Sequence, residues 1–411
     1  MGAQYDIGFE QALSITLDRL TPLAAVSLPV NEAVGLVAAE NCLAEADCPS
    51  APTSAKDGYA VVWSDVEKAS QERPVKLKVC GTSVAGGSSQ MTVASGTAVK
   101  IMTGARIPDG ADAVIADESA REEDGWVSCF RDSRRNIIER GYDVAKGDVV
   151  ASRGEILTPA RTGLLAAAGI SVVRVYPMPR VGVLATGDEL VSPGEPLKAG
   201  QLYASNLVTL ISWLRHFRME AEVAIVADEA DTLAKAATRM LERFDVLLTS
   251  GGAWKSDRDL TIKVLQEMGG EVVFHRVRMG PGKAVALILL DNKTVFCLPG
   301  GPPSNEIAFL QIALPGLLHL GGRPLVPFES AEATLTKTLR GQKDWTQFFY
   351  ATLEQENGQW FVRPVETKSR LQSQANANAL IKIPEGIEQL EEHRQIEVQV
   401  LWKNQELSKI S

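Results

Sequence analysis

The middle of the chain, residues 179–318, alternates short apolar runs with segments of helical periodicity. The first run, 181–185, stops at the turn-forming Thr186-Gly187-Asp188-Glu189 and predicts a strand that leads into a polar loop. Further strands are expected at 223–225, 245–250, 271–277, 284–290 and 294–298, and helices at 207–217, 233–244 and 260–268. Strands that alternate with helices predict a mainly parallel sheet covered by helices on both faces.

The end of this region predicts a hairpin followed by a helix. Its last two strands are expected to join over Asp291-Asn292-Lys293. Ser304 follows a turn rich in proline and glycine and is the expected N-cap of a helix whose apolar positions run from Ile307 to Leu317. Residues 9–20 also have helical spacing, but the pattern alone does not assign that helix to a domain.

The two flanking regions predict β structure. In the N-terminal half, short strands separated by glycine-rich turns are expected at 75–80, 96–102, 113–116 and 125–130. After residue 326, alternation predicts strands at 332–339, 347–353, 360–365, 379–383 and 395–401, which suit a small barrel or sandwich. The expected fold class is therefore a multidomain α/β plus β protein.

Length and composition narrow the class of protein. With 411 residues the chain exceeds the about 250–300 residues that one hydrophobic core usually serves, so several domains are expected. No run reaches the roughly 18 apolar residues of a membrane span, and the N-terminal stretch lacks the pattern of a secretion signal, so the cytoplasm is the expected location. The net charge of −9 disfavours a nucleic-acid partner.

The cysteine and histidine content limits the possible chemistry. The five cysteines are scattered without CxxC spacing, and the four histidines lie far apart in sequence. This argues against a disulfide framework, a structural zinc site and a histidine-based metal or hydrolase centre. Any metal therefore has to be held by carboxylates.

Three glycine-bearing polar segments follow predicted strands: Thr186-Gly187-Asp188-Glu189, Thr249-Ser250-Gly251-Gly252 and Leu298-Pro299-Gly300-Gly301-Pro302. Each segment alone is typical of an ordinary turn. Ligands of α/β sheets bind outside the carboxyl ends of the strands, so three such segments at one edge predict a binding site. Glycine, hydroxyl side chains and the free N–H groups of the helix after Ser304 suit an anion such as phosphate.

Charged residues accompany these segments. Asp188 with Glu189, and Asp257 with Asp259, are candidates to bind Mg²⁺ against an anionic substrate, and a solvated loop acid or a helix cap is the alternative for each pair. Lys283, in a Pro-Gly-Lys turn, offers a positive charge to phosphate or another oxyanion, or else is an exposed lysine without a role.

Eight sequence motifs follow one another along nearly the whole chain. They are SAKDGYA at 54–60, IMTGA at 101–105, RGYD at 140–143, TGDEL at 186–190, TSGG at 249–252, Asp259 with Thr261, PGK at 281–283 and LPG at 298–300. Their order and spacing resemble the molybdopterin molybdenumtransferase family, which includes the E domain of gephyrin. A lone SGG or PGK means little, whereas the ordered set is specific.

The resemblance implies four domains and an elongated homodimer. The implied bounds are 26–44 with 145–177 for an extended β-rich linker domain, 45–144 for a second β-rich domain, 1–25 with 178–326 for an α/β molybdopterin-binding domain, and 327–411 for a barrel-like C-terminal β domain. It also implies an active site between the α/β domain of one subunit and the second domain of the other.

The implied reaction is insertion of molybdate into adenylyl-molybdopterin, with Mg²⁺ as the metal and AMP as a product. When the motifs are matched to those of the family position by position, the residues implied to act in catalysis are Asp57, Asp143, Glu189 and Asp259. Of these four, Asp57, Glu189 and Asp259 are also expected to hold the metal. The residues expected to bind the pterin and nucleotide are Thr103, Thr186, Gly187, Asp188, Ser250, Gly251, Gly252, Lys283, Pro299 and Gly300. Because molybdate and pyrophosphate are anions, the carboxylates must act through the metal or as proton acceptors. A molybdopterin adenylyltransferase and recipient apo-enzymes are the expected protein partners.

Some positions at this expected site depart from the family pattern, namely Lys56, Tyr142, Ala204, Gly280 and Gly301. These departures leave open an insertase specific for tungstate, and a non-catalytic chaperone or scaffold that binds molybdopterin. A molybdopterin adenylyltransferase would rest on the same α/β domain, but the additional β-rich domains favour insertion.

Overall fold

The computed structural model of the chain describes residues 4–87, 91–130, 134–251, 260–323 and 328–402. By their internal contacts the residues form two compact units. Unit 1 consists of Met1–Ala25 and Tyr176–Ser411, and unit 2 of Val26–Val175. The division into four domains remains a prediction, because a division into two units does not test the finer domain boundaries.

The centre of unit 1 is a mostly parallel sheet, as expected. Four neighbouring strands run parallel, in the order β18 (Ala221–Val226), β15 (Val181–Thr186), β19 (Val246–Ser250) and β22 (Lys293–Leu298). The sheet continues through β21 (Ala286–Leu290) and β20 (Glu271–Gly280), which are antiparallel neighbours, and β1 (Gln4–Gly8), which is parallel to β20. Strands β15, β19 and β22 therefore end side by side at one edge.

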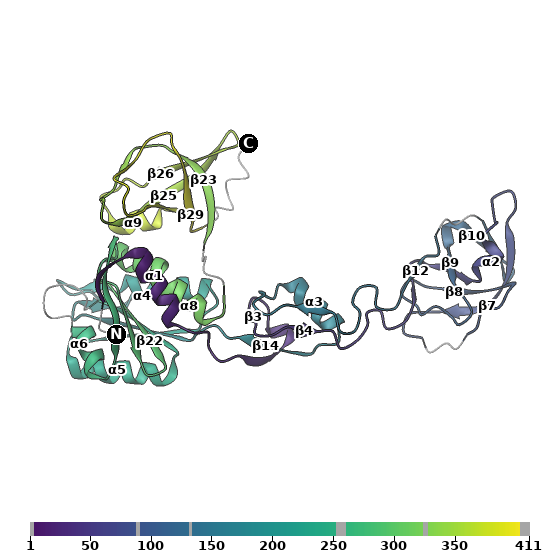
Figure 1. The fold of residues 1–411 in the computed structure, drawn as a ribbon, viewed down its shortest axis with the longest axis horizontal. Helices are drawn as coiled ribbons and strands as arrows, with labels where there is room; N and C mark the ends of the chain where they lie inside the picture. Colours follow the sequence, from purple (N-terminus) through teal and green to yellow (C-terminus); the bar gives the residue numbers. More distant parts are fainter. Residues whose placement is uncertain (1–3, 88–90, 131–133, 252–259, 324–327, 403–411) are drawn as a thin grey trace. The chain divides into compact units, whose positions relative to one another are not determined.

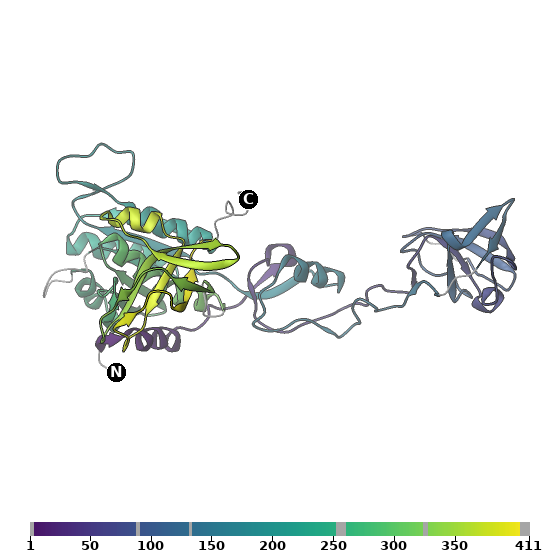
Figure 2. The ribbon, with the colours of Figure 1, turned by 90° about the horizontal axis from the view of Figure 1, so that it is seen from above.

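Helices cover both faces of this sheet. Successive residues of a strand point to opposite faces, so Val183 packs with one buried cluster and Leu184 with the other. The first cluster is covered by α1 (Phe9–Arg19), α4 (Ser205–His216), α7 (Pro302–Ala308) and α8 (Leu314–Leu320), and the second by α5 (Ala230–Arg243) and α6 (Leu260–Glu267). Figures 1 and 2 show α1, in purple, beside the helices of unit 1, which assigns the N-terminal helix that the pattern left unassigned.

The structure confirms the hairpin and corrects the helix that follows it. In the hairpin Leu290 pairs with Lys293, so the loop contains only Asp291 and Asn292. Ser304 is not an N-cap: α7 begins at Pro302, after Gly301. Proline is favoured in the first turn because its φ is preset and the N–H it lacks has no helical partner there. The expected single helix is in fact α7, a π-helical stretch Phe309–Ala313 and α8 in succession.

The C-terminal part of unit 1 is a small closed barrel, as expected. Its strands follow the order β25 (Thr346–Glu356), β26 (Gln359–Pro364), β23 (Glu329–Leu335), β29 (Gln395–Val400) and β27 (Ala379–Ile383). Strand β27 also pairs with β25, which closes the ring. A short helix, α9 (Arg370–Ala375), and a two-strand ladder of β24 (Leu339–Arg340) and β28 (Gln389–Leu390) complete this region.

Unit 2 is rich in short strands. Its largest sheet has the order β10 (Ala120–Glu123), β11 (Trp126–Cys129), β7 (Val75–Ser83), β8 (Thr97–Ile101), β6 (Gly58–Val61) and β9 (Ala113–Ala116), with α2 (Trp63–Val66) following β6. Gly58 allows β6 to pair closely with β9, because a Cβ at this position would lie 2.0 Å from the carbonyl oxygen of Ile115.

Smaller ladders make up the rest of unit 2. They are β2 (Val26–Pro29) with β14 (Val172–Tyr176) and β3 (Val37–Ala38), β4 (Cys42–Leu43) with β13 (Val149–Ala151), and β5 (Thr53–Ser54) with β12 (Ile137–Ile138). Helix α3 (Pro159–Ala167) is N-capped by the Thr158 hydroxyl. Among the helices of the described residues, none is long and apolar enough to cross a membrane.

Candidate functional site

A cavity of about 130 Å³ lies at the carboxyl ends of β15, β19 and β22. Five of the residues predicted from the sequence line it: Thr186, Glu189, Ser250, Gly251 and Gly300. The other lining residues are Ala185, Leu190, Leu202, Tyr203, Ala204, Ser205, Asn206, Leu207 and Pro302. The structure thus brings the three predicted strand-end segments together around one space.

Close backbone packing holds these segments in place. Gly251 has a φ of +101°, and a Cβ at this position would lie 2.6 Å from the carbonyl oxygen of Thr186. Its N–H donates to the carbonyl oxygen of Leu298 at 3.3 Å. A residue with a side chain would therefore separate the ends of β15 and β19, which explains the glycine at position 251.

Two asparagines that sequence reasoning missed tie the segments together through side chains. Asn206, on α4, donates to Ser250 Oγ at 3.3 Å and to the carbonyl oxygen of Gly300 at 2.8 Å. Asn305, on α7 and only 1% exposed, donates to Ser250 Oγ at 3.0 Å and to the carbonyl oxygen of Pro299 at 2.8 Å. An asparagine within a helical pattern carries no sequence signal for the loop it contacts.

Hydroxyl groups at the strand ends remain for a ligand or water. The Oγ1 atoms of Thr186 and Thr249 are buried and have no hydrogen-bond partner within the described residues. Leaving a buried hydroxyl unpaired costs about 1–3 kcal/mol. Of the two, Thr186 lines the cavity, so its hydroxyl is available to a molecule that enters there.

The remaining predicted residues of unit 1 lie outside the lining of this cavity. Asp188 accepts a hydrogen bond from the backbone N–H of Asp228 at 3.3 Å. Lys283 Nζ lies 3.9 Å from a carboxylate oxygen of Asp6 and 4.8 Å from the centre of the Trp345 ring. Gly187 and Pro299 neighbour the lining residues in sequence without belonging to them. Gly252, Asp257 and Asp259 fall outside the described residues.

In unit 2 the structure joins two predicted residues, Asp57 and Thr103. Oδ1 of Asp57 accepts from the backbone N–H of Thr103 at 2.6 Å and from its hydroxyl at 2.8 Å. These two hydrogen bonds, the backbone one first, lower the pKa of Asp57. The carboxylate stays ionised and its second oxygen is left for other contacts. The side chain of Asp143 is exposed, and its backbone N–H donates to the carbonyl oxygen of Cys48 at 2.9 Å.

The fit to a resident metal ion is poor in the described part of the chain. No group of three or more aspartate, glutamate, histidine or cysteine side chains gathers there in a way that could hold a metal. Glu189 lines the small cavity without a second acidic residue, and Asp57 belongs to the other unit. The predicted Mg²⁺ site therefore remains a prediction, and no chemical step is derived from it.

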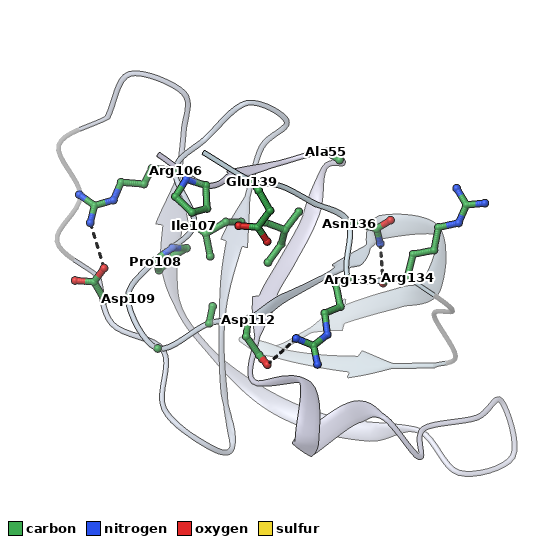
Figure 3. A pocket seen from close by; sticks show the side chains of 14 residues that line it. Ala55, Arg106, Ile107, Pro108, Asp109, Asp112, Arg134, Arg135, Asn136 and Glu139 are labelled. Carbon is green, nitrogen blue, oxygen red and sulfur yellow. Dashed lines mark hydrogen bonds and ion pairs between the residues drawn. The ribbon is translucent and has the colours of Figure 1, made fainter. Parts of the chain in front are cut away.

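A larger cavity, of about 680 Å³, lies within unit 2 (Figure 3). Four of its charged side chains form two ion pairs, Arg106 with Asp109 at 3.2 Å and Arg135 with Asp112 at 3.5 Å. None of the residues predicted to bind or react lines it. The smaller cavity is the better candidate, because three strand-end segments converge on it.

Comparison with protein families matches three consecutive regions of the chain. Residues 7–169 match the MoeA N-terminal region (domain I and II), residues 182–319 a probable molybdopterin binding domain, and residues 332–401 the MoeA C-terminal region (domain IV). The small cavity falls within the second of these regions.

Curated relatives and solved structures match over most of the chain. The molybdopterin molybdenumtransferase of Haemophilus influenzae is 38% identical over 355 residues, which are 84% of this chain and 86% of that protein. The enzyme of the same name from Bacillus subtilis is 32% identical over 88% of this chain and 86% of its own length. A crystal structure of the molybdopterin biosynthesis MoeA protein of Pyrococcus horikoshii has a TM-score of 0.83 and 30% identity, and covers 97% of this chain and 100% of that one.

Proposed function

The chain belongs to the molybdopterin molybdenumtransferase family, and we propose on that premise that it inserts molybdate into adenylyl-molybdopterin and releases AMP. The observation that carries the proposal is the cavity at the ends of β15, β19 and β22, where glycine backbone, hydroxyl groups and one carboxylate meet. Such a set suits a substrate with acceptor oxygens and a proton to lose.

The residues of the cavity have separable roles in this proposal. Hydroxyls of Ser250 and Thr186 donate hydrogen bonds to acceptor oxygens of the substrate, and Gly251 and Gly300 let it approach the backbone. Glu189 is an anion and repels molybdate and pyrophosphate, so it acts as a proton acceptor, through a metal ion, or both. Asp57, Asp143 and Asp259 are proposed to act in the same reaction, and Gly187, Asp188, Gly252, Lys283, Pro299 and Thr103 to help bind the substrate.

Dependence on Mg²⁺ is part of the proposal and has its own test. The family resemblance assigns the ion to Asp57, Glu189 and Asp259, and its chemistry would be to neutralise the charge of molybdate and pyrophosphate. Dialysis against a chelator, followed by return of Mg²⁺, is expected to abolish and then restore AMP release. AMP release that persists in the chelator would remove the metal from the proposal.

The activity is tested by AMP release from adenylyl-molybdopterin with molybdate, tungstate or no oxyanion. Molybdate is expected to be required. Glu189→Gln is expected to lower kcat by about 10²-fold or more, because a missing proton acceptor costs that much. Glu220→Gln, at an exposed position of unit 1, is the matched control and should behave as the wild type. Wild-type kcat in Glu189→Gln would refute the role of this carboxylate.

Two alternatives are decided by the same assay. The departures at Lys56, Tyr142, Ala204, Gly280 and Gly301 favour a molybdopterin-binding chaperone or scaffold as the second candidate. Lys56 pairs with Glu118 at 3.7 Å, and Ala204 lines the cavity without a charge. Tight binding of the finished cofactor without AMP release would indicate the chaperone. Release with tungstate alone would indicate an insertase for that metal, and formation of adenylyl-molybdopterin from ATP an adenylyltransferase.

We also propose a homodimer that receives its substrate from a molybdopterin adenylyltransferase and delivers its product to apo-enzymes. The family resemblance supports the dimer, because it divides the expected acids between two subunits. The mass in solution, measured by light scattering, should be about twice the 44.3 kDa of one chain. A monomer with full insertion activity would contradict it.

A further inference from the structure

The hydroxyl of Ser250 lies between two amide groups whose orientation is determined. Asn206 Nδ2 and Asn305 Nδ2 each lie within hydrogen-bond distance of Ser250 Oγ, at 3.3 and 3.0 Å. The same two nitrogens contact the carbonyl oxygens of Gly300 and Pro299, both at 2.8 Å. A carbonyl oxygen can only accept, so the nitrogen of each amide, and not its oxygen, must face it.

This arrangement determines what the Ser250 hydroxyl can do. Each Nδ2 has two hydrogens, one for the backbone carbonyl and one for Ser250 Oγ. A serine oxygen has two acceptor lone pairs and one proton. With both lone pairs occupied by Asn206 and Asn305, the hydroxyl can act only as a donor. Within the described residues its proton has no acceptor in the protein, and Ser250 lines the cavity.

From this geometry we infer that Asn206 and Asn305 are positioning residues that hold the Ser250 hydroxyl as a hydrogen-bond donor aimed into the cavity. The ligand atom it meets is an acceptor oxygen. This assignment of the ligand rests on the proposed function, under which the oxygen is either the carbonyl of the pterin ring or a phosphate oxygen of the adenylyl group.

The burial of Asn305 argues against a role in packing alone. Its Oδ1 atom is buried and has no hydrogen-bond partner in the described part of the chain. An unsatisfied buried acceptor costs about 1–3 kcal/mol, and an apolar side chain of similar shape would avoid that cost. The reason for an asparagine at position 305 is therefore its amide nitrogen, which donates hydrogen bonds to both Ser250 and Pro299.

Neutron diffraction on crystals of the wild-type protein exchanged into D₂O tests the orientation without any ligand. One deuteron of each amide is expected on the line to Ser250 Oγ, and the Ser250 deuteron is expected to point into the cavity. A Ser250 deuteron directed at an acceptor of the protein would overturn the inference. Because this measurement needs no activity, it stands apart from the test of the proposed function.

A double-mutant cycle tests the consequence, with affinity for adenylyl-molybdopterin as the readout. Ser250→Ala and Asn206→Ala are each expected to weaken binding by about 3- to 10-fold, which corresponds to one neutral hydrogen bond. If Asn206 acts through Ser250, its replacement in the Ser250→Ala protein should change the affinity by less than about 2-fold. Independent, multiplicative losses would show that Asn206 affects binding without acting through Ser250, which would overturn its positioning role. Ser212→Ala removes an exposed hydroxyl of the same helix and is the control.

Two smaller probes identify the acceptor. If Ser250→Ala weakens binding of 6-hydroxymethylpterin alone, the acceptor is the pterin carbonyl; if it weakens binding of AMP alone, it is a phosphate oxygen. Unchanged affinity for both probes and for adenylyl-molybdopterin would overturn the donor role. A protein that releases no AMP but shows the deuteron in the cavity would refute the proposed function and support the orientation of Ser250.

Discussion

At the scale of single residues, the pair of Asp57 and Thr103 shows how a side chain can be prepared for chemistry. Both hydrogen bonds of Thr103 go to the same oxygen of Asp57, at 2.6 and 2.8 Å. A hydrogen bond to the ionised form favours ionisation, so the pKa of Asp57 is lowered. These hydrogen bonds stabilise the folded state above the ordinary pKa of an aspartate, and that contribution is lost as the pH falls through the lowered value.

Replacement of Thr103 by valine should raise the pKa of Asp57. Thr103→Val removes the hydroxyl donor and keeps the backbone N–H, which is the larger cause of the shift. The pKa is therefore expected to move part of the way back to its usual value, and the acid limb of the stability profile to move to higher pH. NMR titration of the Asp57 carboxyl carbon measures this.

The control for this substitution is Thr82→Val, at an exposed position of β7 in the same sheet. It should leave the titration of Asp57 unchanged. An unaltered pKa in Thr103→Val would mean that the backbone N–H alone accounts for the shift.

The sequence predicted single residues of the site better than their contacts. A change from apolar residues to glycine and polar residues marks the end of a strand in the sequence. This signal identified five residues that line the cavity: Thr186, Glu189, Ser250, Gly251 and Gly300. Asn206 and Asn305, which contact Ser250, could not be predicted from the sequence, because their role depends on which helix packs against which loop. The role of Lys283 stays a prediction from its turn, and in the structure its Nζ lies 3.9 Å from a carboxylate oxygen of Asp6.

At the scale of elements, the junction between α7 and the C-terminal barrel depends on one buried carboxylate. Glu306, on α7, accepts hydrogen bonds from Trp213 of α4 at 2.8 Å, Tyr350 of β25 at 2.7 Å and Gln374 of α9 at 2.8 Å. Burial, and then the charge of Glu306, raises the pKa of Tyr350, so its hydroxyl remains a donor. The carboxylate thus joins α7 to three other elements of unit 1. Helix α7 is the helix that directly follows Gly300 in the sequence.

Tyr350→Phe should destabilise unit 1 by about 1.5–3 kcal/mol, the usual value of a hydrogen bond to a charged group. The ring is retained and only the donor to Glu306 is lost. Urea unfolding followed by tryptophan fluorescence measures the loss. Tyr5→Phe, which removes a hydroxyl from a side chain that is 58% exposed, is the control. Equal stability of the two variants would show that Glu306 is satisfied without Tyr350.

The same junction explains which elements could be predicted. Strand and helix periodicity located the sheet, the helices and the barrel strands of unit 1, because each element buries one face. The capping preference of serine predicts the start of α7 at Ser304, but the helix begins at Pro302, because two prolines can themselves begin a helix. The π-helical stretch within the following helix has no counterpart in the periodicity, since its residues are buried on all sides.

At the scale of the whole molecule, unit 2 is an insertion within unit 1. The chain leaves unit 1 after Ala25 and returns at Tyr176. Val26 and Val175 are partners in the antiparallel pair of β2 and β14, so the two crossings lie about 5 Å apart. The hydrophobic clusters agree with this division, because each of the six clusters of buried side chains in the described residues belongs to a single unit.

A chain in which a short glycine–serine linker replaces residues 26–175 should therefore fold as unit 1. Its near-UV circular dichroism and its cooperative thermal unfolding are expected to persist, and residues 26–175 produced alone should also fold. Full-length protein measured beside both fragments is the reference. A deleted chain that lacks a cooperative transition would show that unit 1 depends on the insertion.

The double crossing also determines how the protein responds to a single protease cut within unit 2. The N-terminal fragment would retain β1 and α1, which belong to the sheet and the helical cover of unit 1, and the C-terminal fragment would retain the rest of that unit. Both products would thus share one hydrophobic core. The nicked protein would migrate as one species in a native gel and as two bands in denaturant, so its apparent integrity would conceal the break.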